Sequence, residues 1–387
     1  MINEIKSPYI FKKIFNYILE KKVLLKIIKH NKLLQKKLDI SINEYIECSN
    51  QIEIIIYPDK ENLNTEINEF IYPNSKNSFC HIFFDKEKKE VDRYYLKRNE
   101  NISIIRIILD KKFKSISKLF YNCSCIKFIQ FIKNNRDDFT DISQMFYGCS
   151  NLIRLEITKL KTNNIEDMNG LFYNCSKLKK INLSNFQTNK VKNMGYMFYN
   201  CMSLKELDLS SFKTDNLINI SSMFFGCSSL ISLNLSNFKT NEITSMNSLF
   251  YKCSSLIKIN LSSFQTDNVI NMSSMFFECK SLSELDLSSF KTNSVADMSK
   301  MFFGCKLLKK LDLSNFITDN VNNMRSMFAR CRSLKEFDFS NINTNKAKVF
   351  SMFSQCPKRL REKIRNEYKN IKKEAFEEKP YYYWIKN

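Results

Sequence analysis

Residues 207–227 have the sequence LDLSSFKTDNLINISSMFFGC, and residues 311–331 repeat it as LDLSNFITDNVNNMRSMFARC. The repeat is marked by cysteines at intervals of 26 residues, and the last interval is 25 residues. These cysteines, called the cysteine ladder below, are Cys123, Cys149, Cys175, Cys201, Cys227, Cys253, Cys279, Cys305, Cys331 and Cys356. A fixed period of this length is typical of a solenoid, in which each unit packs only on its neighbours. The sequence therefore predicts a solenoid of nine units over residues 123–356.

The apolar residues of one unit predict a short strand followed by a short helix. Leu207 and Leu209 flank Asp208, which is the alternation of a strand with one buried face. The next apolar residues have the spacing of one helical face: Leu217, Ile220, Met223, Phe224 and Cys227. Thr214 and Asp215 precede them and are predicted to cap the helix. The expected fold class is an α/β repeat solenoid, with a curved parallel β-sheet and short helices on the other face.

A Gly or Asn stands directly before many ladder cysteines. Both residues tolerate the left-handed backbone conformation that ends a helix. The positions are Asn122, Gly148, Asn174, Asn200, Gly226 and Gly304.

The recurring cysteine is predicted to fill the same small buried space in every unit, because a free thiol packs as a small apolar group. Neighbouring ladder positions would lie about 4.8 Å apart, a distance that permits disulfides, although each thiol would have two equal neighbours. A metal site has weaker support, since the chain has only His30 and His81, and its single close cysteine pair is Cys123 and Cys125. No metal ligand and no cofactor is predicted.

The unit LDLSSFKTDNLINISSMFFGC and its copies resemble the BspA-like leucine-rich repeat family over residues 123–356. The resemblance implies a curved parallel-sheet solenoid used for protein recognition. Known members are often secreted or surface-attached bacterial adhesins, with relatives in protozoa. The resemblance therefore also implies an alternative function, a surface-exposed adhesin that binds a host or extracellular protein. The chain shows no export signal and no stretch of about 18 apolar residues, so a cytoplasmic location is expected.

Two columns of residues are predicted to bind a partner protein, because in a leucine-rich repeat they lie on the concave outer face of the sheet. The first column lies between the two inward residues of each strand: Glu156, Asn182, Asp208, Asn234, Asn260, Asp286, Asp312 and Asp338. The second lies two places earlier: Arg154, Lys180, Glu206, Ser232, Lys258, Glu284, Lys310 and Glu336. An alternative for the first column is a ladder of side-chain hydrogen bonds without a ligand. The charge of the second column changes sign along the stack, as that of a partner-binding surface would. Random substitution of exposed residues without a binding role would give the same pattern.

A column of aromatic residues follows the buried Phe of each unit. Its members are Tyr121, Tyr147, Tyr173, Tyr199, Phe225, Tyr251, Phe277 and Phe303, and Ala329 ends the run. Two interpretations are open: an exposed aromatic ridge that binds a partner, or rings that stack on adjacent units.

Residues 1–48 are predicted to form a separate helical region. The segment 7–38 resembles an F-box, the helical motif that docks on the Skp1 adaptor of a ubiquitin ligase. The resemblance implies adaptor-binding roles for Pro8, Ile14, Phe15, Tyr17, Leu24 and Leu25. A helical hairpin that caps the solenoid would show the same pattern, and both interpretations stay open.

The remaining regions are predicted to cover the two ends of the solenoid. Residues 49–122 contain short β-rich runs and are expected to form an N-terminal cap. Residues 357–387 are expected to form a C-terminal capping helix and tail, with one apolar face made by Leu360, Ile364, Tyr368 and Ile371.

Charge and motifs limit the function. The net charge of +21 would suit a polyanion, but the lysines are spread over the whole chain, so nucleic acid is not predicted as a partner. The chain has no GxxxxGK[ST], GxSxG, HExxH or CxxC motif and only two histidines, so no catalytic residue is predicted. The prediction is a non-enzymatic protein-recognition scaffold, in a more specific version a substrate receptor of a ubiquitin ligase. The oligomeric state is not determined by the sequence.

Overall fold

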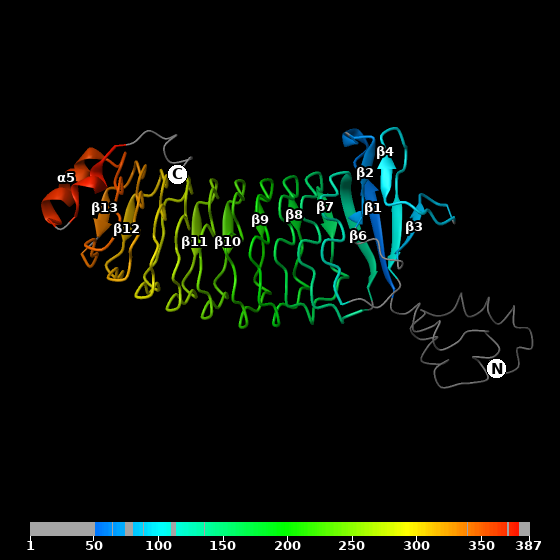
Figure 1. The fold of residues 1–387 in the computed structure, drawn as a ribbon, viewed down its shortest axis with the longest axis horizontal. Coiled ribbons are helices and arrows are strands. Elements are labelled where there is room, and N and C mark those ends of the chain that lie inside the picture. Colours follow the sequence, from blue (N-terminus) through cyan, green and yellow to red (C-terminus); the bar gives the residue numbers. More distant parts are fainter. Residues whose placement is uncertain are drawn as a thin grey trace, which may run out of the picture.

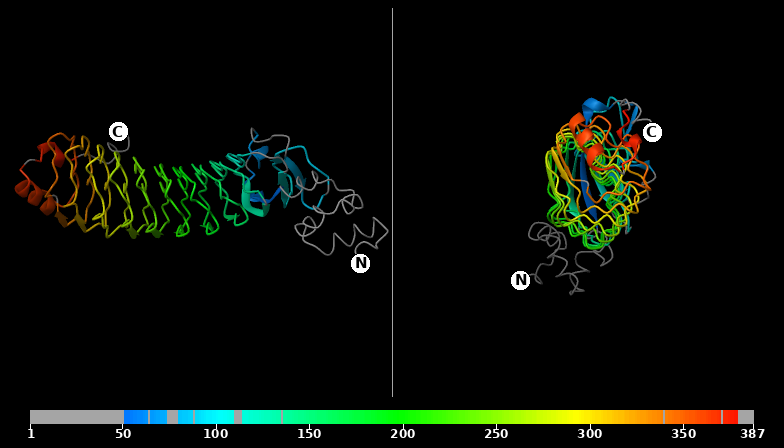
Figure 2. Two further views of the ribbon diagram at one scale, coloured as in Figure 1. Left: turned by 90° about the horizontal axis from the view of Figure 1, so that it is seen from below. Right: turned by 90° about the vertical axis from the view of Figure 1, so that its left-hand side faces the viewer.

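The computed structural model describes residues 51–63, 65–73, 80–87, 89–109, 114–134, 136–338, 340–369 and 371–378. In this part of the chain, a long stack of coils joins a β-rich end to an end formed by a helix (Figure 1). Viewed along the stack, successive coils superpose on one another (Figure 2). Residues 1–48, including the predicted adaptor-binding residues, lie outside the described residues.

The β-rich end continues the sheet of the solenoid. Its elements are β1 (Ile52–Pro58), η2 (Lys60–Asn62), β2 (Ile67–Glu69), β3 (Cys80–Phe84), β4 (Tyr95–Lys97), β5 (Ile105–Leu109) and β6 (Ile126–Asn134). The main sheet has the order β3-β5-β1-β6-β7-β8, in which β1 is antiparallel to both β5 and β6. From β6 onward the pairing is parallel, with Phe128 opposite Arg154 of β7. The edge of the first coil is therefore hydrogen-bonded to β1, which removes a site of edge-to-edge aggregation.

The solenoid strands are short and parallel. They are β7 (Arg154–Glu156), β8 (Lys180–Ile181), β9 (Glu206–Leu207), β10 (Ser232–Asn234), β11 (Lys258–Asn260), β12 (Lys310–Asp312) and β13 (Glu336–Asp338). Their register is one repeat: Leu233 of β10 pairs with Leu207 and with Ile259. In β10, β11, β12 and β13 the middle residue is buried and its two neighbours are exposed, as the alternation of apolar and polar residues predicts.

The short helices predicted opposite the sheet are not formed. In the coil of residues 220–227, tight turns follow one another, because the amide of Met223 donates to the carbonyl of Ile220 and that of Cys227 to Phe224. Two of the amides between them donate to the next coil, Phe224 to Leu249 over 3.0 Å and Gly226 to Tyr251 over 2.6 Å, whereas Phe225 donates to Ser222 of its own coil. The apolar residues have the spacing of a helix because consecutive tight turns, like a helix, direct a side chain into the core every three or four residues.

The backbone conformation explains why a helix cannot form. Each coil has two residues with positive φ, four places apart, such as Ser222 at 55° and Gly226 at 70°. A left-handed residue interrupts the helical hydrogen-bond pattern. The left-handed conformation predicted before the ladder cysteine is confirmed at Asn122, Gly148, Asn174, Asn200, Gly226 and Gly304. The other left-handed position of each coil lies four residues earlier. It is not regularly Gly or Asn, so the sequence does not predict it.

Threonines that were predicted to cap helices join neighbouring coils instead. The Oγ1 atom of Thr266 donates to the carbonyl of Lys291 over 2.7 Å and accepts from the amide of the same residue over 2.8 Å. Thr214, the predicted cap, likewise accepts from the amide of Lys239 over 2.7 Å. Both threonines are buried. One hydroxyl therefore satisfies both backbone groups of a residue in the next coil at a corner where the strands have ended.

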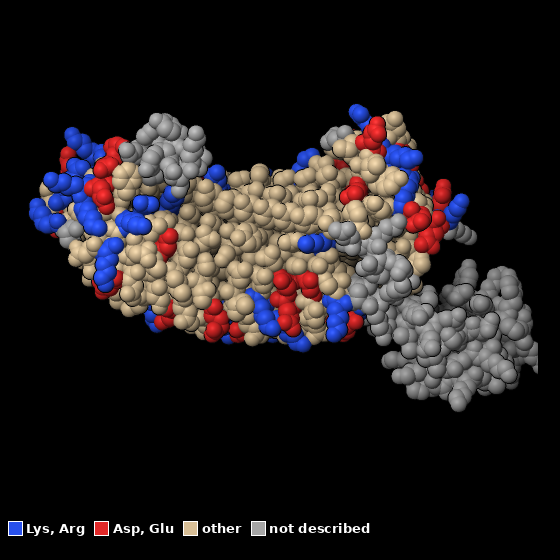
Figure 3. Space-filling model, in the orientation of Figure 1, with Lys and Arg blue, Asp and Glu red and all other residues tan. Residues whose placement is uncertain are grey.

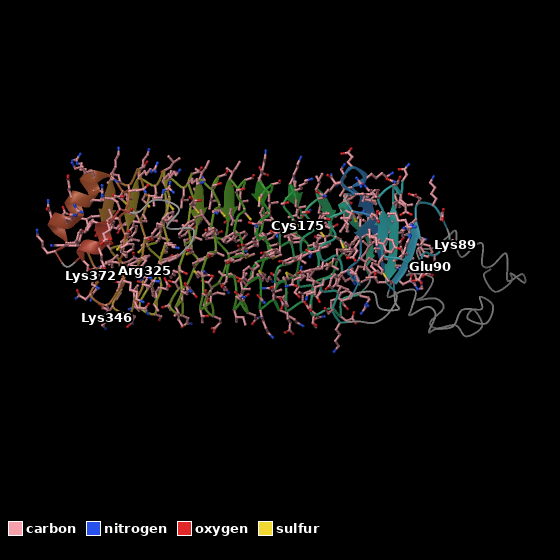
Figure 4. The ribbon with its side chains drawn as sticks, turned by 45° about the horizontal axis from the view of Figure 1, so that its top comes forward. Lys89, Glu90, Cys175, Arg325, Lys346 and Lys372 are labelled. Carbon is pink, nitrogen blue, oxygen red and sulfur yellow. The ribbon has the colours of Figure 1, made fainter. Side chains whose placement is uncertain are left out.

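The last coil is covered by residues that follow Pro357. Helix α5 (Lys358–Glu367) buries Leu360 and Ile364, and the 3-10 helix η4 (Lys373–Phe376) lies beside the final turns. The amides of Ser351 and Phe353 donate to carbonyls of residues 374 and 375, as they would to a further coil. Lys372 donates to the carbonyl of residue 347 over 3.0 Å, and in Figure 4 its label lies near those of Arg325 and Lys346 at this end.

Candidate functional site

The two predicted binding columns form an outward surface of the stack, called the sheet face below. The columns are exposed along their length, apart from Glu156, which is half-buried. Between them lie inward apolar residues, for example Leu207 and Leu311, which are buried, and Leu285, which is half-buried. Coil spacing fixes the distance between equivalent positions at about 4.8 Å. The sheet face is therefore a regularly spaced array of polar side chains.

The first column has a local structural role as well as an exposed position. Asp208 accepts a hydrogen bond from the amide of Ser210 over 2.9 Å, and Asp286 accepts one from Ser288 over 2.9 Å. The same bond recurs at Asn182, Asn234, Asn260, Asp312 and Asp338. These bonds stay within one coil, unlike the bonds between coils that a ladder would need. They also lower the pKa of Asp208 and Asp286 by stabilising the ionised carboxylate.

The charge of the second column changes sign several times along the stack. Arg154 forms an ion pair with Glu156 of its own coil. Lys310 lies 3.8 Å from the carboxylate of Glu336 in the next coil, and both side chains are well exposed. Such exposed pairs contribute little stability, which leaves these side chains free to exchange partners. The second column can therefore take part in recognition without weakening the fold.

The ladder cysteines lie inside the stack, as predicted, and Figure 4 shows Cys175 between the two ends. The ladder cysteines are free thiols. Each ladder thiol from Cys149 onward donates to the carbonyl of a Phe in the preceding coil; for Cys175 the partner is Phe146 at 3.1 Å. The sequence predicted the buried position of the cysteine but not its hydrogen bond, because every residue has a backbone carbonyl and the acceptor therefore has no sequence signal.

Burial also makes the ladder thiols unreactive. It raises the pKa of Cys175 well above its ordinary value and the pKa of Cys227 to about 12, because the thiolate would lose its hydration. A reactive cysteine needs a lowered pKa and access to solvent. Within the described residues, no group of three His, Cys, Asp or Glu side chains could hold a metal ion. The ladder therefore serves packing and hydrogen bonding.

The aromatic column is a continuous stack. The rings of Tyr147 and Tyr173 have centroids 4.2 Å apart and an interplanar angle of 4°, and similar stacking runs from Tyr121 to Phe303. The rings are half-buried as far as Tyr251, whereas Phe277 and Phe303 are buried. Of the two interpretations, stacking on adjacent coils is confirmed. The ring faces contact one another, so the column offers edges and hydroxyls to a partner.

Charged residues are unevenly distributed over the molecule. Figure 3 shows a face with few charged side chains between the two ends, while Lys, Arg, Asp and Glu gather along its lower margin and at both ends. Among the described residues, none of the helices has the length and apolar character that crossing a bilayer requires.

The repeats match a family model three times. The matched residues are 114–233, 229–336 and 284–375, and the family is described as "Mycoplasma protein of unknown function, DUF285". These matches cover the region in which the sequence resembles BspA-like repeats, and they support that part of the assignment. No curated protein matches the chain.

Proposed function

The chain belongs to this DUF285 family, and on that premise we propose that it is a non-enzymatic scaffold that recognises a partner protein through the sheet face. One observation carries the proposal: the sheet face is a regular array of outward side chains whose charge changes sign several times along the stack. A solenoid places such side chains at a fixed spacing along an extended surface, which is the usual binding surface of repeat proteins.

The internal structure supports this division of roles. Backbone groups at the turns are satisfied from coil to coil, and the thiols and threonine hydroxyls complete the pairing at the corners. Stability therefore depends on inward and corner positions, while the outward residues of the strands are available for a partner. The aromatic column is less suited to recognition, since its ring faces are already stacked.

Capture of a partner from the native cell by the purified full chain tests the proposal. The variant combines Asp286→Asn, Lys310→Glu and Asp312→Asn; asparagine keeps the turn that each aspartate makes and removes only its charge. The matched control combines Asp215→Asn, Asp267→Asn and Lys291→Glu, which are exposed residues away from the sheet face.

We expect the sheet-face variant to lose the partner that the wild type and the control retain, with unchanged circular dichroism in all three. Retention of the partner by the sheet-face variant would assign recognition to another surface.

A cytoplasmic location is part of the proposal. The role as a ubiquitin-ligase receptor is a finer proposal that depends on residues 1–48. Calorimetric titration of the full chain with a Skp1-type adaptor tests this role, with Pro8, Leu24 and Leu25 replaced together by alanine as the control. Micromolar binding that the control loses would support a ligase receptor. An adaptor that does not bind would leave a general scaffold, with the adhesin as the alternative.

A further inference from the structure

A pair of exposed isoleucines lies directly beside the second column of the sheet face, where two of its middle strands begin. Ile231 and Ile257 immediately precede β10 and β11 and are 46% and 49% exposed. The amide of Ile257 donates to the carbonyl of Ile231 over 3.1 Å, so the two residues are direct neighbours in adjacent coils. The equivalent positions of the flanking coils are polar, Lys205 and Ser283. The pair is therefore a small exposed apolar patch, called the apolar centre below, at the margin of the polar sheet face.

Carboxylates lie on both sides of this isoleucine pair. The preceding coil contributes Glu206 and Asp208, and the following coil contributes Glu284 and Asp286. Glu206 is opposite Ser232 in the strand register, and Ser283 is hydrogen-bonded to Ile257. Each acidic pair is thus one coil, about 4.8 Å, from the nearer isoleucine.

The two central glutamates differ from those nearer the ends of the sheet face. Glu156 pairs with Arg154 and Glu336 with Lys310, whereas neither Glu206 nor Glu284 has a cation within ion-pair distance in the described part of the chain. Hydrogen bonds from Ser210 and Ser288 lower the pKa of Asp208 and Asp286, which keeps these two carboxylates ionised. The apolar centre is therefore bracketed by negative charge.

The local charge is opposite to that of the whole chain. Positions 205–208, 231–234, 257–260 and 283–286 hold four carboxylates and two lysines, Lys205 and Lys258, which gives a local net charge of −2. The chain as a whole has +21. Charge complementarity at such a site favours a basic partner and disfavours an acidic one.

We propose that the isoleucine pair and its flanking carboxylates bind a peptide segment of a partner protein, in which an apolar residue stands between basic residues. This inference rests on the proposed function, because it assumes that the sheet face is the binding surface. An extended peptide advances about 3.3 Å per residue, so basic residues two positions before and after the apolar anchor reach the two carboxylate pairs. The anchor covers Ile231 and Ile257, and the basic side chains meet Glu206 and Glu284.

Selection of a displayed random peptide library on the full chain tests the inference. We expect enriched peptides to carry an apolar residue with Lys or Arg two positions away on both sides. Synthetic peptides of the enriched sequence should bind at least tenfold more weakly to the variant Ile231→Ser/Ile257→Ser and to the variant Glu206→Lys/Glu284→Lys. Binding should also weaken as salt rises.

Two control variants of the same composition separate the site from general effects. Ile218→Ser/Ile270→Ser removes isoleucines that are 54% and 52% exposed and lie away from the sheet face. Glu61→Lys/Glu242→Lys makes the same charge change at other exposed positions. Both control variants should bind the selected peptide as the wild type does.

The outcomes separate this inference from the proposed function. Peptides that bind the sheet face but lack basic residues would overturn the inference and leave the scaffold proposal intact. Peptides whose binding no sheet-face variant changes would contradict both. A selection that enriches no peptide over a blank support would overturn the inference alone, since a folded partner surface could still bind the sheet face.

Discussion

The Sγ atom of Cys227 lies 3.1 Å from the carbonyl oxygen of Phe198 in the preceding coil. The same carbonyl also accepts the amide of Cys201, so the thiol occupies a second acceptor direction that the chain of turns leaves open. The side chain must therefore be small, largely apolar and able to donate one hydrogen bond. Cysteine meets all three conditions, which explains its recurrence better than volume alone.

Replacement of Cys227 separates the hydrogen bond from the volume. Cys227→Ala should lower the free energy of unfolding by about 1–2 kcal/mol, through a lost buried group and a lost weak hydrogen bond. Cys227→Val should cost at least as much, because a bulkier side chain must fit between coils about 4.8 Å apart and cannot donate. Urea unfolding followed by circular dichroism measures both. A valine variant as stable as the wild type would refute the hydrogen-bonding role.

Alkaline pH should destabilise the protein through its buried thiols. A free thiol in the unfolded chain has a pKa near 8.5, and burial raises that of Cys227 to about 12. A group whose pKa is raised in the fold contributes full stability below the unfolded pKa and loses it as pH rises toward the folded value. Between pH 9 and 11, the wild type should lose about 1.4 kcal/mol per pH unit more than Cys227→Ala. Equal losses would show that this thiol ionises in the folded protein.

Gly226 should resist replacement for two separable reasons. Its φ is 70°, and a Cβ atom there would lie 2.1 Å from Oδ1 of Asn200 in the preceding coil. Gly226→Ala should therefore destabilise the protein by about 2–3 kcal/mol. In an Asn200→Gly background the steric part disappears, and about 1 kcal/mol should remain from the left-handed backbone. The double-mutant cycle is measured by thermal unfolding, and additive effects would exclude the contact with Asn200.

The hydroxyl of Thr266 should matter more than its methyl group. Thr266→Val keeps the shape but leaves the amide and carbonyl of Lys291 without this partner, and should cost about 2 kcal/mol. Thr266→Ser keeps the hydroxyl and should cost about 1 kcal/mol or less. Thermal unfolding of the two variants compares them directly. A serine variant less stable than the valine variant would show that packing dominates at this corner.

Much of the architecture could be predicted from the sequence, because the period and the strand alternation report burial directly. Leu207 and Leu209 are buried with Asp208 exposed between them, and the 25-residue final interval reappears as the pairing of Asn323 with Lys348. The six Gly and Asn residues before ladder cysteines are left-handed as predicted, because these residue types favour that backbone conformation, whereas Lys252 and Glu278 adopt it without such a signal.

Other features could not be predicted, because their cause lies in the neighbouring coil. The residues from Ile220 to Cys227 have helical spacing, yet Ser222 adopts a left-handed conformation with no signal in its own identity. Thr214 resembles a helix cap in its own coil, but its partner is Lys239, 25 residues later. Likewise, the sequence placed Glu206 and Glu284 on the binding face without showing that Ile231 and Ile257 between them are exposed.

Photo-crosslinking tests the central claim, that a partner binds the sheet face, most directly. The full chain is expressed in its native cell with a photoreactive amino acid at one of three positions. These are Ser232 on the sheet face, Tyr196 beside the aromatic column, and Arg359 on α5. Ser232 and Arg359 are exposed, and Tyr196 is 40% exposed. We expect a discrete crosslinked partner from position 232 alone. Crosslinking from position 196 or 359, with none from 232, would contradict recognition through the sheet face.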